Sequence, residues 1–170
     1  VEVLLEAMPL ILKKYPNAQV LYAGQHQNVM GEQAYFDRLI PQIHEYEMTG
    51  HWTFLGNLSP VQLAALYPNI DVLTVPSLNS TEAFGLVQIE AMINGAPSVP
   101  SALPGVRRPV QMHGMGVVSE IGNAESLAAS ILEVLDNPQK YRGDVDGIKK
   151  SYEPDSVAQE YEKLFERLMK

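Results

Sequence analysis

Hydrophobic residues recur along the chain with two spacings, one typical of amphipathic helices and one typical of short buried strands. In residues 1–15 they recur every three or four positions, which predicts a helix that ends before Pro16. Residues 18–24 form instead a short, mostly apolar run closed by Gly24, which predicts a strand. The same order of strand, polar loop and helix then repeats along the chain.

This repeat predicts the layout of the whole chain. The expected strands are residues 18–24, 52–56, 71–75, 96–101 and 116–118, and the expected helices are residues 1–15, 32–46, 59–67, 86–93, 124–135 and 155–169. Parallel strands need crossover helices, so the alternation predicts an α/β fold with a doubly wound parallel sheet covered on both faces. Ligands of such sheets bind beyond the carboxyl ends of the strands, so we expect a site in the loops that follow them.

Length and composition fit one compact domain over residues 1–170. With 46% apolar and 19% charged residues, and no apolar run near the ~20 residues that cross a bilayer, we expect a soluble protein. The net charge of -8, with only 12 Lys and Arg, argues against nucleic acid as a partner. Cysteine is absent and residues 1–6 show no secretory leader, so we expect a cytoplasmic location.

One loop at the expected carboxyl edge, residues 76–85, stands out from the others. A polar turn with Gly85 runs directly into a helix, so the N–H groups of Gly85, Leu86 and Val87 are expected to face the edge of the sheet. A helix N-terminus favours an anion. A phosphate would therefore be well placed there.

Two glutamates flank this helix start. We expect Leu86, Ile89 and Ile93 to form the core stripe of the helix, which leaves Glu90 on another face where it can reach a ligand. Glu82 precedes the helix and lies closer to the expected anion site. A carboxylate can accept hydrogen bonds from two neighbouring hydroxyls, as on a ribose, and a second carboxylate can stabilise positive charge developing at an anomeric carbon.

This segment resembles the Glu-x7-Glu motif of the retaining GT-B glycosyltransferases of family 4, also called glycosyl transferases group 1, with Glu82 and Glu90 as the pair. The resemblance extends over nearly the whole chain, through residues 21–24, 54–56, 75–77, 90–92, 104–107 and 114–118. It implies the Rossmann-like C-terminal domain of the GT-B fold, which binds a sugar nucleotide.

The resemblance also implies a role for each residue of the motif. Glu90 would hold the ribose hydroxyls of a nucleoside diphosphate, and Glu82 would be the catalytic residue at the transferred sugar. The remaining donor-binding residues would be Phe84, Gly85, Leu86 and Val87, through their amides, and Leu55, Gly56 and Asn57 near the base. The reaction would move the sugar to an acceptor hydroxyl with retention of configuration, with no bound metal or other cofactor.

Two parts of the family pattern are not found in this sequence. The family has a central strand ending in Gly-Arg, followed by a Lys, before the helix that here begins the chain, and those two basic side chains clamp the diphosphate. The acceptor-binding N-terminal domain is the second part. We therefore expect a domain that lacks its first strand and acts only within a longer parent protein, whose N-terminal domain would make any contact with a membrane surface.

Several alternatives remain open at this point. Glu82 and Glu90 can be an ordinary helix-capping charge and a solvated helix residue, and Arg107 and Arg108 can be solvated loop charges or substitute phosphate ligands. The chain can also be a non-catalytic nucleotide-binding or interaction module, or a sugar-nucleotide epimerase of the same architecture. His26, His44, His51 and His113 lack metal-ligand spacing and are expected to be packed or surface residues. We expect Asp144 and Asp146, between two glycines, to form a turn rather than a metal site.

Overall fold

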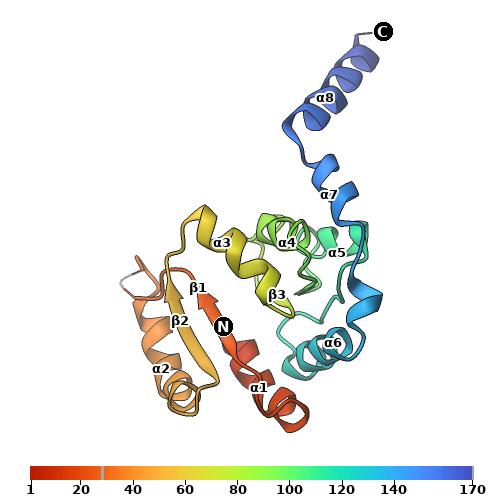
Figure 1. The fold of residues 1–170 in the computed structure, drawn as a ribbon. Coiled ribbons are helices and arrows are strands. Elements are labelled where there is room, and N and C mark those ends of the chain that lie inside the picture. The colour runs from red at the N-terminus through yellow and green to blue at the C-terminus, as the bar shows by residue number, and fades with distance from the viewer. Residues whose placement is uncertain (28, 170) are drawn as a thin grey trace.

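The computed structural model describes residues 1–27 and 29–169 as short parallel strands with helices packed around them (Figure 1). The strands among these residues are β1 (Val20–Ala23), β2 (Trp52–Gly56), β3 (Leu73–Val75) and β4 (Ser98–Pro100). β1 pairs with β2 and β3 pairs with β4, both in parallel. The expected α/β fold with parallel strands is confirmed.

The fifth expected strand is reduced to two isolated bridges beside β4. They join Ser98 to Gly116 and Ser101 to Ser119. A Cβ on Gly116 would lie 1.8 Å from the carbonyl oxygen of Ser98, so only glycine allows the two backbones to run this close together.

The two strand pairs are not hydrogen-bonded to each other among the described residues. β1 lies on the side of β2 nearer to β3 (Figure 1), so one edge of β1 and one edge of β3 have no strand partner in this part of the chain. One further parallel strand bonded to both edges would join the pairs into a single sheet.

Helices connect and cover the strands. They are α1 (Glu2–Lys14), α2 (Gln33–Met48), α3 (Pro60–Leu66), α4 (Leu86–Met92), α5 (Arg108–His113), α6 (Ala124–Asp136), α7 (Val145–Ser151) and α8 (Pro154–Leu168), with 3-10 turns η1 (Tyr67–Asn69) and η2 (Pro138–Tyr141). The six expected helices are confirmed. The short helices α5 and α7 were not expected.

The main core lies where α1 packs against α6 and α2. Leu5, Met8 and Leu127 are each at most 1% exposed within it. Fully burying a side chain of this size contributes roughly 1.5–3 kcal/mol, so this packing is a large part of what holds the two strand pairs in one body. Two smaller clusters lie on either side of α4, one with Met115 and one with Tyr67.

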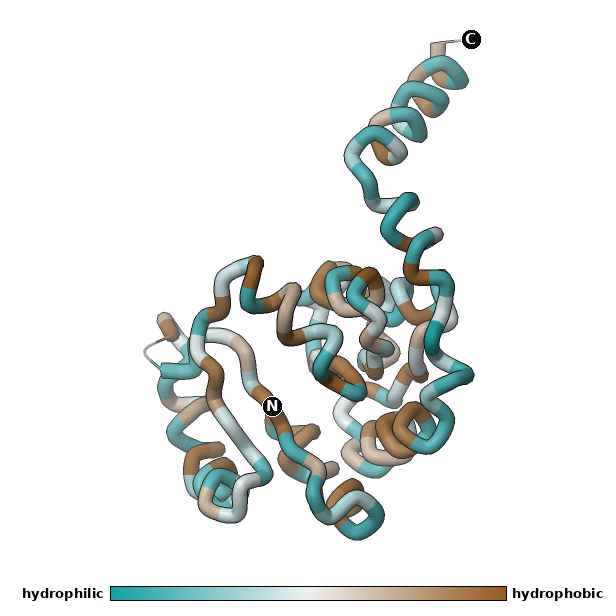
Figure 2. The backbone as a smooth tube through the Cα atoms, in the orientation of Figure 1, coloured by the Kyte–Doolittle hydropathy of each residue, from teal (hydrophilic) through white to brown (hydrophobic). Residues whose placement is uncertain are grey.

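None of the residues of α8 is buried, which is also true of the shorter α3. α8 extends away from the rest of the chain, with apolar residues along its length (Figure 2). Tyr161, Phe165 and Leu168 are each more than half exposed there. No helix in the described part of the chain is long and apolar enough to cross a membrane.

The structure corrects the expected core stripe of α4. Leu86 is 64% exposed, whereas Gln88 is fully buried. The first residue of the helix lies at the open carboxyl edge, and the helix is covered on two sides rather than along one stripe. The prediction was wrong for Leu86 and right for Ile89, which is 5% exposed.

Candidate functional site

The loop between β3 and α4 ends in a left-handed glycine. Gly85, with φ 75° and ψ 57°, is the N-cap residue of α4. A Cβ at this position would lie 2.5 Å from the side-chain nitrogen of Gln88, so both the backbone angle and the space select glycine. The helix begins at Leu86, as the sequence predicts.

Glu82 folds back onto this helix start. Its carboxylate oxygen Oε1 accepts a hydrogen bond from the Gly85 N–H at 2.9 Å. The carboxylate thus already accepts the hydrogen bond of one of the amides that the family resemblance assigns to the sugar nucleotide. An anion that binds the Gly85 N–H would have to displace the Glu82 carboxylate from it. The displaced carboxylate would then lie next to that anion.

Gln88 is the buried polar centre of the site. Its Nε2 donates to the carbonyl oxygen of Val106 at 2.7 Å, and its Oε1 accepts from the Ser98 hydroxyl at 3.1 Å. These bonds tie α4 to β4 and to the loop that follows β4. The sequence did not reveal Gln88, because a glutamine on a short helix is expected to be exposed on grounds of its polarity.

The loops after β3 and β4 touch each other backbone to backbone. A Cβ on Gly105 would lie 1.7 Å from the carbonyl oxygen of Ala83. Beside this contact Arg107 is half-buried, and its Nη1 donates to the carbonyl oxygen of Ala102 at 3.3 Å. Arg108 is exposed at the first position of α5. Neither arginine is in an ion pair within the described residues.

Glu90 lies one turn along α4 and is exposed, as expected. Its carboxylate oxygen Oε2 accepts a hydrogen bond from the hydroxyl of Tyr67 at 3.0 Å. Burial, and then the bond to Glu90, raise the pKa of Tyr67 above its usual range. A tyrosine is already protonated near neutral pH, and the raised pKa of Tyr67 keeps the phenol a donor to the carboxylate at still higher pH.

The remaining motif residues of α4 and its loop differ in exposure. Phe84 packs its ring against the cluster of Ile89 and Met92, so only its backbone is available to a ligand. Val87 is half-buried against the cluster of Tyr67. Leu86 and Val87 are the first two helical residues, whose N–H groups have no acceptor within a helix.

Leu55, Gly56 and Asn57 lie at the carboxyl end of β2, in the other strand pair. No hydrogen bond among the described residues links them to residues 82–90. The connection runs through α3, which starts at a capping box: the Gln62 N–H donates to the Ser59 hydroxyl, and the Ser59 N–H donates to the Gln62 side chain. α3 runs from the end of β2 toward β3 (Figure 1) and leads into η1.

The histidines and the two late aspartates show no metal-binding arrangement. No group of three or more His, Cys, Asp or Glu residues in the described part of the chain is placed to hold an ion. The expected turn at Asp144 and Asp146 was wrong, because these residues begin α7. The Asp144 carboxylate accepts from the Gly147 N–H at 3.0 Å and caps the helix.

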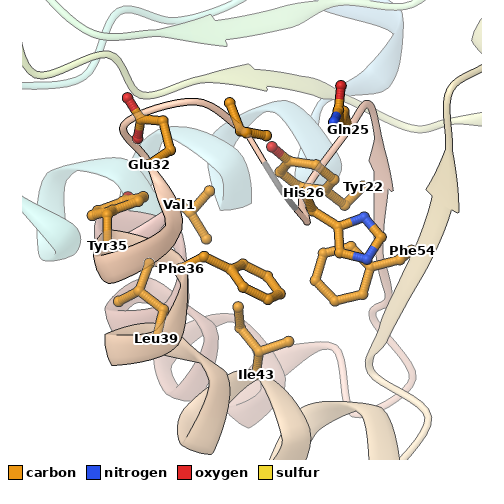
Figure 3. Close-up of a pocket in the computed structure, with 11 residues that line it drawn as sticks. Val1, Tyr22, Gln25, His26, Glu32, Tyr35, Phe36, Leu39, Ile43 and Phe54 are labelled. Atoms are coloured by element: carbon orange, nitrogen blue, oxygen red, sulfur yellow. The ribbon is translucent and has the colours of Figure 1, made fainter.

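A cavity of about 320 Å³ lies in the other half of the molecule, between α2 and the β1–β2 pair. Its lining includes Tyr22, His26, Phe36 and Phe54, and Phe36 points across it toward Phe54 (Figure 3). The ring of His26 stacks on Phe54 with centroids 3.9 Å apart. Sequence reasoning did not find this cavity, because its walls come from separate elements.

Known proteins resemble this chain in sequence. Residues 1–147 match a family model described as glycosyl transferases group 1. The phosphatidyl-myo-inositol mannosyltransferase of Mycolicibacterium smegmatis is 29% identical over 142 residues, which cover 83% of this chain and 34% of that protein. The chain thus spans about a third of that relative's length.

Solved structures resemble it in fold. Sucrose-phosphate synthase from Thermosynechococcus elongatus superposes with a TM-score of 0.76 at 26% identity, over 98% of this chain and 42% of that one. The Anabaena protein HepE, in complex with UDP-glucose, superposes with a TM-score of 0.68 at 26% identity, over 88% of this chain and 43% of HepE. In both cases the solved chain is more than twice as long as the matched region.

Proposed function

Because this chain belongs to the glycosyl transferases group 1 family, we propose that it is the nucleotide-sugar-binding domain of a retaining glycosyltransferase. The reaction moves a sugar from a nucleoside diphosphate to an acceptor hydroxyl, and it needs no bound metal. The β3–α4 loop carries the proposal: two glutamates flank a left-handed glycine at a helix start, in a chain with the Rossmann-like fold of a GT-B domain.

The proposed contacts divide the loop between sugar and nucleotide. Glu90 accepts hydrogen bonds from the two ribose hydroxyls, and its exposure on α4 supports this role. Glu82 faces the transferred sugar, where its charge stabilises the oxocarbenium-like transition state. The amides of Phe84, Gly85, Leu86 and Val87 bind sugar and diphosphate oxygens, and the ligand replaces the Glu82 carboxylate at the Gly85 N–H. The free N–H groups are the donors here, because a helix of seven residues has only a small dipole.

The other strand pair supplies the base site in this proposal. The backbone of residues 55–57 lies at the carboxyl end of β2, where ligands of doubly wound sheets bind. UDP-glucose in the HepE complex supports a nucleotide sugar as the ligand class. The donor base and sugar are left open by contacts of this kind, which depend on backbone and shape.

We also propose that activity requires a longer protein. The chain spans about a third of the mannosyltransferase, and the free edges of β1 and β3 support a further strand between them. That strand would bring the basic pair that clamps the diphosphate, and an acceptor-binding domain would position the hydroxyl that attacks. On its own the chain would bind a nucleoside diphosphate weakly and transfer no sugar, because too few cations face the two phosphates.

The two glutamates provide the test, in the complete parent protein. Glu90→Gln should weaken binding of UDP or GDP in calorimetry by about 1–3 kcal/mol, the usual loss for a charge-assisted hydrogen bond. Glu82→Ala should lower kcat far more than it lowers affinity for the free nucleoside diphosphate, because its contact is to the sugar. Glu162→Gln, on the exposed α8, is the matched control and should change neither. Unchanged nucleotide affinity in Glu90→Gln would remove that residue from the site.

A further inference from the structure

Tyr67 is a buried phenol whose hydroxyl reaches the carboxylate of an exposed glutamate. We propose that Tyr67 is a positioning residue that holds Glu90 ready for a ribose, and so selects nucleotides with intact ribose hydroxyls. This inference rests on the proposed role of Glu90. It assigns a function in ligand selection to a side chain that does not touch the ligand.

The ring of Tyr67 is fixed by its surroundings. Tyr67 is 3% exposed and packs with Ala91 and Ala96, and the partly buried Leu63, Ile70, Leu73 and Val87 surround this cluster. A ring held in this way leaves its hydroxyl only rotation about the C–O bond. The 3.0 Å bond to Glu90 therefore starts from a donor whose position is set by the fold.

Glu90 has little else to hold its side chain. No ion pair in the described part of the chain includes it. The neighbouring Asn94 side chain donates to the backbone oxygen of Glu90, at 2.8 Å, and not to the carboxylate. A free glutamate loses rotamer freedom when it binds, and that loss opposes affinity. The bond from Tyr67 restricts those rotamers before the ligand arrives.

The bond also leaves enough acceptor capacity for a ribose. A carboxylate has about four lone-pair positions, of which Tyr67 uses one on Oε2. Oε1 and the remaining position on Oε2 can still accept from two vicinal hydroxyls. A ligand without these hydroxyls gains nothing from the arrangement, which is why the effect of Tyr67 should depend on the ribose.

A double-mutant cycle in the complete parent protein tests the inference, with UDP, GDP and their 2′,3′-dideoxy analogues as probes. Tyr67→Phe keeps the ring and removes the hydroxyl. It should weaken ribonucleotide binding in calorimetry by about 3- to 10-fold, the usual range for one hydrogen bond. It should leave the dideoxy analogues and kcat at saturating donor unchanged. In a Glu90→Ala background, which removes the acceptor of the Tyr67 hydroxyl, it should have no further effect.

The chain offers a matched control for a lost buried hydroxyl. Tyr141 is 6% exposed and donates to the Glu133 carboxylate at 2.9 Å, at the junction of α6 and η2. Tyr141→Phe should lose comparable thermal stability and no ribonucleotide affinity. Tyr67→Phe would have a purely structural effect if it weakened the dideoxy analogues equally, or if its effect persisted beside Glu90→Ala. Either result overturns the inference, as does unchanged ribonucleotide affinity in Tyr67→Phe.

The proposed function fails in a different way. If Glu90→Gln alone leaves ribonucleotide binding unchanged, Glu90 does not hold the ribose and the premise is wrong. If Glu90→Gln weakens binding and Tyr67→Phe does not, the premise stands and only the positioning role of Tyr67 is lost.

Discussion

The two strand pairs hold the loops at their carboxyl ends in different ways. Beside β3 and β4, buried polar groups make directional bonds: Gln88 joins α4 to Val106 and Ser98, and the Ser101 hydroxyl donates to the carbonyl oxygen of Ser77 at 2.7 Å. These bonds fix the direction of each loop as well as its distance. The β3–β4 half is also the half that carries Glu82 and Glu90.

Beside β1 and β2, aromatic packing replaces these bonds. Tyr22 and Trp52 stack with centroids 6.5 Å apart, and Phe54 meets Tyr22 edge-on at 5.4 Å. These ring contacts set the spacing between elements, whereas the hydrogen bonds of the other half also fix the direction of a loop carbonyl. The polar interior thus lies beside the loop that carries the proposed carboxylates and amides, and the apolar interior lies beside the backbone proposed for the base.

Removing the side-chain amide of Gln88 should have a large effect on the β3–β4 half. Gln88→Leu keeps the side-chain size but leaves the Val106 carbonyl and the Ser98 hydroxyl without their partner. Two buried polar groups without hydrogen bonds should lower the free energy of unfolding by about 2–4 kcal/mol. Chemical denaturation measures this loss, and calorimetry with UDP or GDP should show weaker binding.

Gln111→Leu is the control for Gln88→Leu. Gln111 is exposed on α5, so its replacement should stay within about 0.5 kcal/mol of the parent stability. A loss in Gln88→Leu no larger than this would mean that the buried polar bonds do not hold the site loop.

In the β1–β2 half, whose interior is aromatic, we expect a buried polar atom of His26 to be dispensable for stability. The Nδ1 atom of His26 is buried and has no hydrogen-bond partner within the described residues. His26→Phe keeps a ring on Phe54 and removes that atom, so stability should stay equal or rise by up to about 1 kcal/mol. Thermal unfolding of the two forms decides this.

A clear loss of stability in His26→Phe would contradict the contrast between the halves. It would mean that Nδ1 makes a hydrogen bond that matters, for example to water. Phe54→Ala provides the reference for damage to this cluster, because it removes a partly buried ring that His26 stacks on and should lower stability by about 1–3 kcal/mol.

The sequence predicts the elements and the position of the site loop, because both depend on local signals. The helix start after Gly85 follows from a polar turn that meets an amphipathic pattern, and the exposure of Glu90 follows from helical spacing. The burial of Gln88 has no such signal. Its partners, Ser98 and Val106, are 10 and 18 residues away, and only the folded chain brings them together.

The same reason explains the other features that the sequence did not reveal. The bond from Tyr67 to Glu90 crosses from η1 to α4, and the aromatic cavity draws its walls from β1, β2 and α2. α7 was hidden because Asp144 and its flanking glycines suit a turn as well as a helix cap. Periodicity locates elements, but it does not show which polar atoms of different elements meet.

The smallest change in stability is expected for polar groups that lie outside the loops at the carboxyl ends of the strands. Asp144 and Asp146 begin α7, but only Asp144 caps it, through the Gly147 N–H. Asp144→Ala should therefore lower stability by about 1 kcal/mol, whereas Asp146→Asn should change it by less than about 0.5 kcal/mol.

Neither substitution should alter turnover of the parent protein, and a chelator should not alter it either, because we propose a mechanism without a bound metal. If Asp146→Asn abolished turnover, or if only manganese restored turnover after chelation, polar groups outside the site loops would take part in the chemistry. The contrast between the two halves would then no longer identify the active region.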